Sequence, residues 1–106
     1  MAWLWLVLAG LLEVAWAVGL KHSAGFSRPA VSAATVLLMI GSFWLLALAL
    51  RSIPLGTGYA VWTGIGALGT ALVGIVAFGE PATPARLGAL ALVLAGIVGL
   101  RLTTPA

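Results

Sequence analysis

The chain lacks cysteine altogether and carries very little charge. None of its 106 residues is cysteine and only 7% are charged, whereas 63% are hydrophobic. Without cysteine the chain can form no disulfide and no thiolate metal site. Soluble domains ordinarily contain about 25% charged residues. The composition therefore excludes an ordinary soluble domain and predicts a membrane protein.

Acidic side chains are the scarcest charged group. Two acids stand against five lysines and arginines, which gives a formal net charge of +3. The basic residues are scattered over the predicted loops, which is typical of headgroup anchoring and not of a nucleic-acid surface. His22 and Glu80 are isolated polar residues in those loops and form no metal-ligand set. We therefore expect no nucleic acid, metal or cofactor among the partners of this chain.

Four apolar runs occupy most of the chain. Each is near or somewhat below the ~20 residues needed to span hydrocarbon. Long runs without alternation favour helices over a β-barrel, and nothing remains for a second domain. We predict an all-α integral membrane protein whose residues 1–106 form a single four-helix transmembrane domain, with spans at residues 2–20, 30–50, 57–77 and 86–100. The first run has no basic leader, so we interpret it as a helix of the mature protein and not as a secretory signal.

Short polar segments with prolines separate these runs. Residues 21–29, 51–56 and 78–84 contain the breakers, among them Pro29, Pro54 and a Pro81/Pro84 pair. Because the segments are short, neighbouring helices are expected to run antiparallel.

The basic residues give almost no bias for one orientation in the membrane. The first and third loops share a side and hold three lysines and arginines, against two on the side of the termini. Lysine and arginine normally accumulate on the cytoplasmic side. A chain with so little bias can insert both ways up and form an inverted pair of identical subunits. One orientation set by something outside the loops is the alternative. The residues compared are Lys21, Arg28 and Arg86 against Arg51 and Arg101.

Small residues form a stripe along the fourth predicted span. They fall at offsets of 0, 3, 7 and 11, which places them on one helix face: Gly88, Ala91, Ala95 and Gly99. Such stripes let helix backbones approach closely in lipid. We predict a dimer contact here, with packing inside one subunit as the alternative. Four helices fill their own core and leave little room for a solute path, whereas two copies can enclose one.

Glu13 is an acid near the centre of the first span. At 1.5 Å per residue it lies about 16 Å from one helix end and about 10 Å from the other. Burying it ionised costs at least a few kcal/mol, and no lysine, arginine or histidine within a span can pair with it. We interpret the missing cation as a substrate that competes with the proton for this carboxylate. A protonated structural acid, hydrogen-bonded across helices, is the alternative.

Aromatic and hydroxyl side chains are candidates for the surroundings of Glu13. Trp16 lies three residues on, so its indole N–H can donate to the carboxylate and its ring can line a cation site; packing against lipid is the alternative. Ser42, near the middle of the second span, offers a hydroxyl, although serines often bond their own helix. Tyr59 and Trp62 share one face of the third span as two possible walls of a cation site, or Tyr59 belongs to the interfacial aromatic belt.

The third span contains a glycine-rich segment with a formal G-x-G-x-x-G pattern. A dinucleotide fingerprint joins a strand to a helix and is followed by an acid about twenty residues on. Gly64, Gly66 and Gly69 instead interrupt an apolar run with no such acid after it. We predict a helix bend at Gly64 and Gly66, which would suit a moving element.

Taken together, these residues resemble the small multidrug resistance transporters, four-helix proteins of the bacterial inner membrane that work as antiparallel homodimers. The resemblance covers essentially the whole chain. Trp16 beside Glu13 resembles the guanidinium-exporter branch, whereas the multidrug branch usually has a small residue there. Arg51 stands where a lysine is common. The segments that carry the likeness are Glu13 with Lys21, Pro54-Leu55-Gly56-Thr57, Tyr59 with Trp62, and Trp62-Thr63-Gly64-Ile65-Gly66-Ala67.

The resemblance implies a function and roles for these residues. Glu13 would bind substrate and protons in turn, Trp16 and Ser42 would orient it, and Tyr59 and Trp62 would line the site. The planar guanidinium ion offers paired N–H donors that match a carboxylate. We therefore expect no enzyme but a proton-coupled antiporter that exports guanidinium and small guanidinyl cations by alternating access.

Three other functions stay open at this point. The same fold can export hydrophobic quaternary ammonium compounds. A helper subunit could pack against a larger membrane complex through its fourth span, although this leaves Glu13 unexplained. A passive cation channel would show flux uncoupled from protons.

Overall fold

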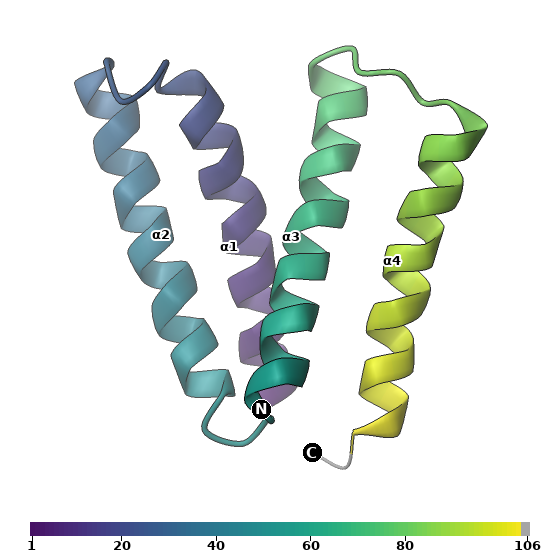
Figure 1. Cartoon of the computed structure of the whole chain (residues 1–106). Helices are drawn as coiled ribbons and strands as arrows, with labels where there is room; N and C mark the ends of the chain where they lie inside the picture. Colours follow the sequence, from purple (N-terminus) through teal and green to yellow (C-terminus); the bar gives the residue numbers. More distant parts are fainter. Residues whose placement is uncertain (105–106) are drawn as a thin grey trace.

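The computed structural model, which describes residues 1–104, consists of four helices. They are α1 (Ala2–His22), α2 (Pro29–Ala49), α3 (Leu55–Ala77) and α4 (Pro84–Thr103), joined by short connections (Figure 1). Within these residues all four helices are long and apolar enough to cross a membrane. The start of α1 and the end of α4 lie at the same end of the bundle (Figure 1). The all-helical fold with four candidate spans is confirmed.

Prolines mark the start of three helices. Pro29 and Pro84 occupy the first turns of α2 and α4, and Pro54 immediately precedes α3. Proline suits these positions because the first amides of a helix have no partner within the helix. The Thr83 hydroxyl accepts a hydrogen bond from the Arg86 backbone N–H at 3.2 Å and caps α4. Of the predicted breakers, Pro29, Pro54 and Pro84 therefore mark helix starts, whereas Pro81 lies in the connection before α4.

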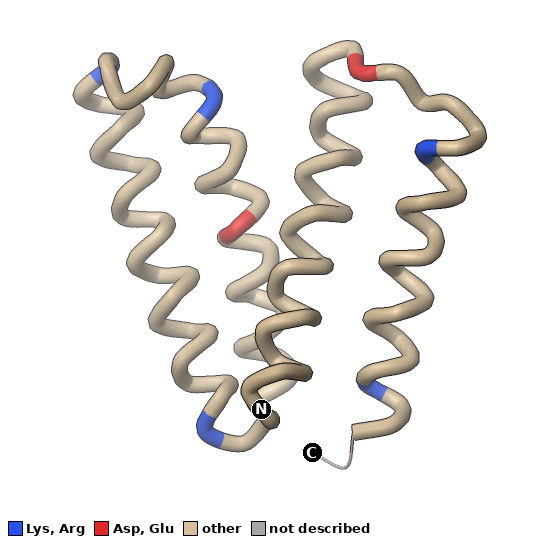
Figure 2. The backbone as a smooth tube through the Cα atoms, viewed as in Figure 1, with Lys and Arg blue, Asp and Glu red and all other residues tan. Residues whose placement is uncertain are grey.

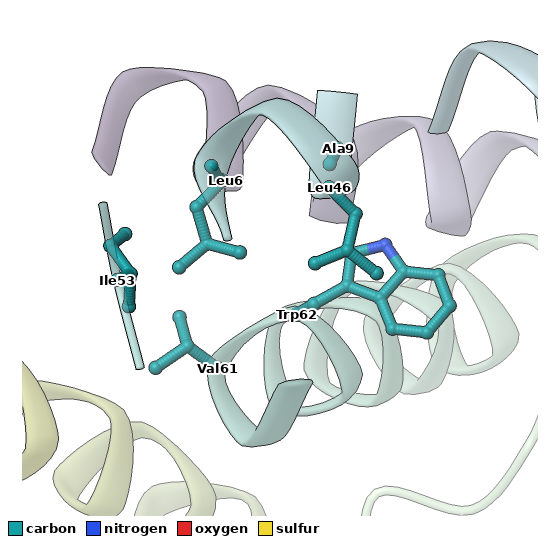
Figure 3. Close-up of a cluster of buried hydrophobic side chains, with 7 residues drawn as sticks. Leu6, Ala9, Leu46, Ile53, Val61 and Trp62 are labelled. Carbon is teal, nitrogen blue, oxygen red and sulfur yellow. The ribbon is translucent and has the colours of Figure 1, made fainter. Parts of the chain in front are cut away.

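Helix α1 is at the centre of the packing. It lies against α2 and α3, whereas the backbone of α4 approaches α3 alone. The buried apolar residues gather near the end that holds the termini, where α1, α2 and α3 meet (Figure 3); they are Leu6, Ala9, Leu46, Ala49, Ile53, Val61 and Trp62. This core is small because most large apolar side chains face outward, as expected of a chain surrounded by lipid.

Charge gathers at the two ends of the bundle (Figure 2). One acidic position stands apart at mid-depth, and the sequence of α1 identifies it as Glu13. At the end away from the termini, Glu80 accepts a hydrogen bond from the Arg86 guanidinium at 3.1 Å. The two carboxylates of the chain therefore have opposite surroundings, since one is exposed and paired and the other lies within a span.

Candidate functional site

The Glu13 side chain lies in a gap between α1 and α3 that exists because residue 66 is glycine. A Cβ added at Gly66 would collide with the carboxylate of Glu13. Gly66 is buried and Glu13 is half-buried. Any larger residue at position 66 would therefore displace the acid from its place. This gap is the local feature that admits a carboxylate into the interior of the bundle.

Two polar atoms in this part of α1 are buried without a hydrogen-bond partner among residues 1–104. They are the Oε1 oxygen of Glu13 and the indole nitrogen Nε1 of Trp16. The hydrogen bond from Trp16 to Glu13 that the spacing allows is not formed in this structure. A buried polar group left unpaired costs about 1–3 kcal/mol, and more when it is charged. One turn of α1 thus presents an acceptor and a donor that are both available to a ligand.

Ser42 connects three helices through two hydrogen bonds. Its hydroxyl donates to the Ala9 carbonyl of α1 at 2.7 Å and accepts from the Trp62 indole N–H of α3 at 3.1 Å. The same carbonyl is the acceptor for the Glu13 backbone N–H in the α-helical pattern. Ser42 therefore does not bond the carboxylate directly in this structure. It holds the turn of α1 from which Glu13 projects.

Four aromatic rings form a continuous chain from α1 through α2 to α3. Trp16 meets Phe43 edge-on at 6.1 Å between ring centroids, and Phe43 meets Trp62 at 5.9 Å. Trp62 in turn contacts Tyr59 at 5.5 Å. All of the aromatic residues predicted for the site are therefore brought together, with Tyr59 still 55% exposed. Ring faces of this kind attract cations.

Phe43 is the member of this chain that the sequence did not single out. Its ring lies between those of Trp16 and Trp62 and contacts both. A usable signal existed, since Phe43 directly follows Ser42 in the middle of a span and so lies far from the interfacial belts where aromatic residues are ordinary.

Gly64 and Gly66 meet different helices. A Cβ at Gly64 would lie 3.1 Å from the Ile97 side chain of α4, whereas one at Gly66 would meet Glu13 of α1. Helix α3 continues without a break from Leu55 to Ala77 across both positions. The two glycines therefore allow close contacts on two sides of α3, and a bend at this place remains a prediction.

The small-residue stripe of α4 packs on nothing within residues 1–104. Nothing lies within 4 Å of a Cβ added at Gly88 or Gly99, and no residue of α4 is buried. Ala91 and Ala95 are exposed as well. Within these residues the stripe has no packing partner, and a dimer contact on this face stays a prediction. The described residues also contain no group of three potential metal ligands.

Comparison with known proteins gives consistent matches. The family model described as Small Multidrug Resistance protein matches residues 1–93. A guanidinium exporter of Escherichia coli strain K12 is 61% identical over 104 residues, which cover 98% of this chain and 99% of that protein. The guanidinium exporter of Yersinia pestis is 60% identical, with 98% and 100% covered. That of Citrobacter freundii is 55% identical, with 98% and 99% covered.

Proposed function

The chain belongs to the Small Multidrug Resistance protein family, a family of transporters and not of enzymes, and we propose that it exports guanidinium and small guanidinyl cations in exchange for protons. Relatives that are 55–61% identical over nearly their whole length are named guanidinium exporters, which supports this substrate. The residue that we assign to both substrate binding and proton coupling is Glu13.

The observation that carries the proposal is that the Glu13 Oε1 oxygen and the Trp16 indole nitrogen, three residues apart on α1, are both buried without a hydrogen-bond partner in residues 1–104. A guanidinium ion has a planar fork of N–H donors that can pair with both oxygens of a carboxylate. The indole N–H three residues on can then orient the acid by donating a hydrogen bond to it. The ring chain through Phe43 and Trp62 supplies aromatic faces next to the bound cation.

Exchange with protons follows from having a single carboxylate for two ligands. An ionised acid at mid-depth needs a compensating positive charge, which either a proton or the organic cation can provide. When one is bound the other has no site. Coupling therefore requires only that the loaded protein alternates between openings to the two sides of the membrane and that the unloaded protein does so slowly.

We further propose an antiparallel homodimer in the bacterial inner membrane. The exposed stripe with Gly88 and Ala95 on α4 offers a face for a second copy. The two ends of the bundle carry three and two lysines or arginines, so neither orientation is favoured by charge. In an inverted pair, two copies of Glu13 would face one shared chamber, with Trp16, Ser42, Tyr59 and Trp62 around each.

Reconstituted transport with a matched pair of acid variants tests the function. Glu13→Gln should abolish guanidinium transport driven by a proton gradient, because the amide holds neither ligand. Glu80→Gln removes the other acid, which is exposed and paired with Arg86 outside the spans, and should leave transport intact. Coupled transport that survives in Glu13→Gln would refute the assignment.

The second candidate function is export of hydrophobic quaternary ammonium compounds. The four-ring chain favours it to some degree, because aromatic faces also bind cations that have no N–H donors. Transport of guanidinium and of tetraphenylphosphonium, measured side by side in the same vesicles, separates the two. We expect the planar ion to be preferred, since only it can pair with the Glu13 oxygens.

A further inference from the structure

A groove of about 290 Å³ lies between α1, α3 and α4, away from Glu13 and its aromatic neighbours. Its walls are almost entirely apolar and include Val7 of α1, Ile65 of α3 and Val98 of α4. None of the four rings that contact one another near Glu13 lines this groove; they are Trp16, Phe43, Trp62 and Tyr59. The groove is therefore a separate feature of the fold that the proposed transport does not use.

Arg101 stands at the mouth of this groove, and no acidic side chain of residues 1–104 pairs with it. Its guanidinium lies 4.9 Å above the ring of Trp3. Within residues 1–104 it makes no hydrogen bond or ion pair, and neither acid is available to it. Glu80 is engaged with Arg86 at the opposite end, and Glu13 lies at mid-depth. An acceptor for the guanidinium N–H donors of Arg101 can therefore come only from outside residues 1–104. Guanidinium groups pair well with phosphate oxygens.

The groove has the depth that suits a lipid. Trp3 lies in the first turn of α1 and Arg101 in the last turn of α4, so the mouth is at the level of the headgroups. From there the apolar walls at Val98 and Ile65 extend toward the middle of the bundle. A phosphate at the mouth and hydrocarbon along the walls would match this order of polar and apolar surfaces.

We propose that this groove binds an anionic phospholipid, whose phosphate pairs with Arg101 and whose acyl chain lies along Val98 and Ile65. An apolar groove within a bilayer gains contacts when hydrocarbon fills it and loses them when it stays empty. An anionic lipid fits better than a zwitterionic one, because the latter carries its own cation beside the phosphate.

The position of the small-residue stripe argues against a second copy as the occupant. At 3.6 residues per turn, Ile97 and Arg101 lie on nearly the opposite side of α4 from Gly88 and Gly99. A subunit that packs on the stripe would therefore leave the Ile97 and Arg101 side of α4 uncovered. Val98 and Leu102 lie nearer the stripe, so such a dimer would border one rim of the groove and leave its Arg101 side open to lipid.

Photoactivatable lipids test the proposal in proteoliposomes of the full chain. Phosphatidylglycerol and phosphatidylcholine with the same diazirine-bearing acyl chain are supplied in trace amounts, and adducts are mapped by mass spectrometry. Phosphatidylglycerol adducts should concentrate on the start of α1 and on the last two turns of α4. Arg101→Gln should reduce them about fivefold, which corresponds to about 1 kcal/mol for one basic residue near an anionic surface. Arg51→Gln removes a charge at the same end but outside the groove, and should leave them unchanged.

A second pair of variants tests the acyl chain separately from the headgroup. Val98→Trp fills the groove and should reduce the adducts of both lipids there. Val76→Trp, at an 85% exposed position of α3 outside the groove, should not. Guanidinium binding and dimer size, measured for every variant, verify that each is folded.

Three results would overturn the lipid site. Adducts that are unaffected by Arg101→Gln would remove the role of the charge, and equal labelling by the two lipids would remove the preference for an anionic headgroup. Val7→p-benzoylphenylalanine places a photoreactive ring on the α1 side of the groove lining, away from the stripe. Protein-to-protein adducts from that position in place of lipid adducts would show that a second copy occupies the groove.

Discussion

The first three helices and α4 are built in different ways. The bundle of α1, α2 and α3 contains the buried residues and the hydrogen bonds that Ser42 makes between helices. Helix α4 has no buried residue and approaches only α3 with its backbone. One part of the molecule is packed to hold side chains in fixed places around Glu13. The other part presents surfaces that only lipid or another chain can cover.

Glycine residues have different roles in these two parts of the molecule. Gly66 in α3 makes room for the Glu13 carboxylate, and its own Cβ position is occupied. Gly88 and Gly96 in α4 have no atom of residues 1–104 within 4 Å of their Cβ positions. Glycine at the packed positions of α3 therefore serves contact within the chain, and in α4 it can serve contact between chains. Four predictions test how far this division holds.

The largest effect is expected at Gly66. Gly66→Val puts a side chain where the Glu13 carboxylate lies, and overpacking of this kind costs about 1–3 kcal/mol. The acid should be displaced and proton-driven guanidinium transport lost. Gly56→Val is the control, because the Cβ position of Gly56, in the first turn of the same helix, has no neighbour within 4 Å among the described residues. Normal transport by Gly66→Val would show that the gap at residue 66 does not position the acid.

The next prediction concerns pH. The cation needs the ionised carboxylate, and protonation of Glu13 removes its partner, so guanidinium affinity should fall as the pH falls. With one proton displaced per cation, the decrease approaches about tenfold per pH unit in the range where the acid is protonated. Isothermal titration of the purified protein at several pH values measures this. An affinity that does not change with pH would separate the cation from the proton and contradict the shared site.

The network at Ser42 should contribute about 1–2 kcal/mol to stability. Ser42→Ala leaves the buried Trp62 indole N–H without its acceptor, which is costly in a dry interior. The control is Ser32→Ala. The Ser32 hydroxyl donates to the Arg28 carbonyl at the exposed start of α2, so its removal should change the stability little. Unfolding in mixed micelles compares the two. Equal stability of both variants would mean that the link between α1, α2 and α3 adds nothing.

The smallest effect is expected on α4. Gly88→Leu should weaken dimerisation about fivefold, near the lower end of the cost of overpacking, and should leave the subunit folded. Gly96→Leu is the matched control, since Gly96 is also exposed and has no neighbour at its Cβ position in the described part of the chain, but lies off the stripe. The fraction of monomer in detergent measures the dissociation of the two variants and allows them to be compared. A stronger effect of Gly96→Leu would place the contact on another face of α4.

The number and type of the helices were predictable because hydropathy reports directly on the length of chain that lipid can surround. Their ends were less so, and the structure extends α1 to His22 and α4 to Thr103 beyond the apolar runs. Backbone hydrogen bonding continues through Lys21 and Arg101 since a helix does not require apolar side chains. The start of α1 at Ala2 and the end of α3 at Ala77 coincide with the predicted bounds, whereas α4 begins at Pro84, two residues before its predicted start.

The candidate site was predictable in its members and not in its contacts. Residue types and spacing pointed to Glu13 and its aromatic neighbours, yet Ser42 bonds the Ala9 carbonyl and not the acid. Phe43 was missed because its ring contacts depend on how α2 is rotated against α1 and α3. Periodicity defines the faces of one helix but does not define which faces of two helices meet.

By itself, the amino-acid sequence determined that this chain forms four apolar helices with one acid in the middle of the first, because lipid admits only helices of that length and excludes other charges from their centre. Only the tertiary structure decided that Gly66 lies against Glu13, that Ser42 connects three helices, and that α4 remains outside the core. The physical reason is that such contacts arise from the relative rotation and depth of several helices, and these quantities exist only once the helices pack.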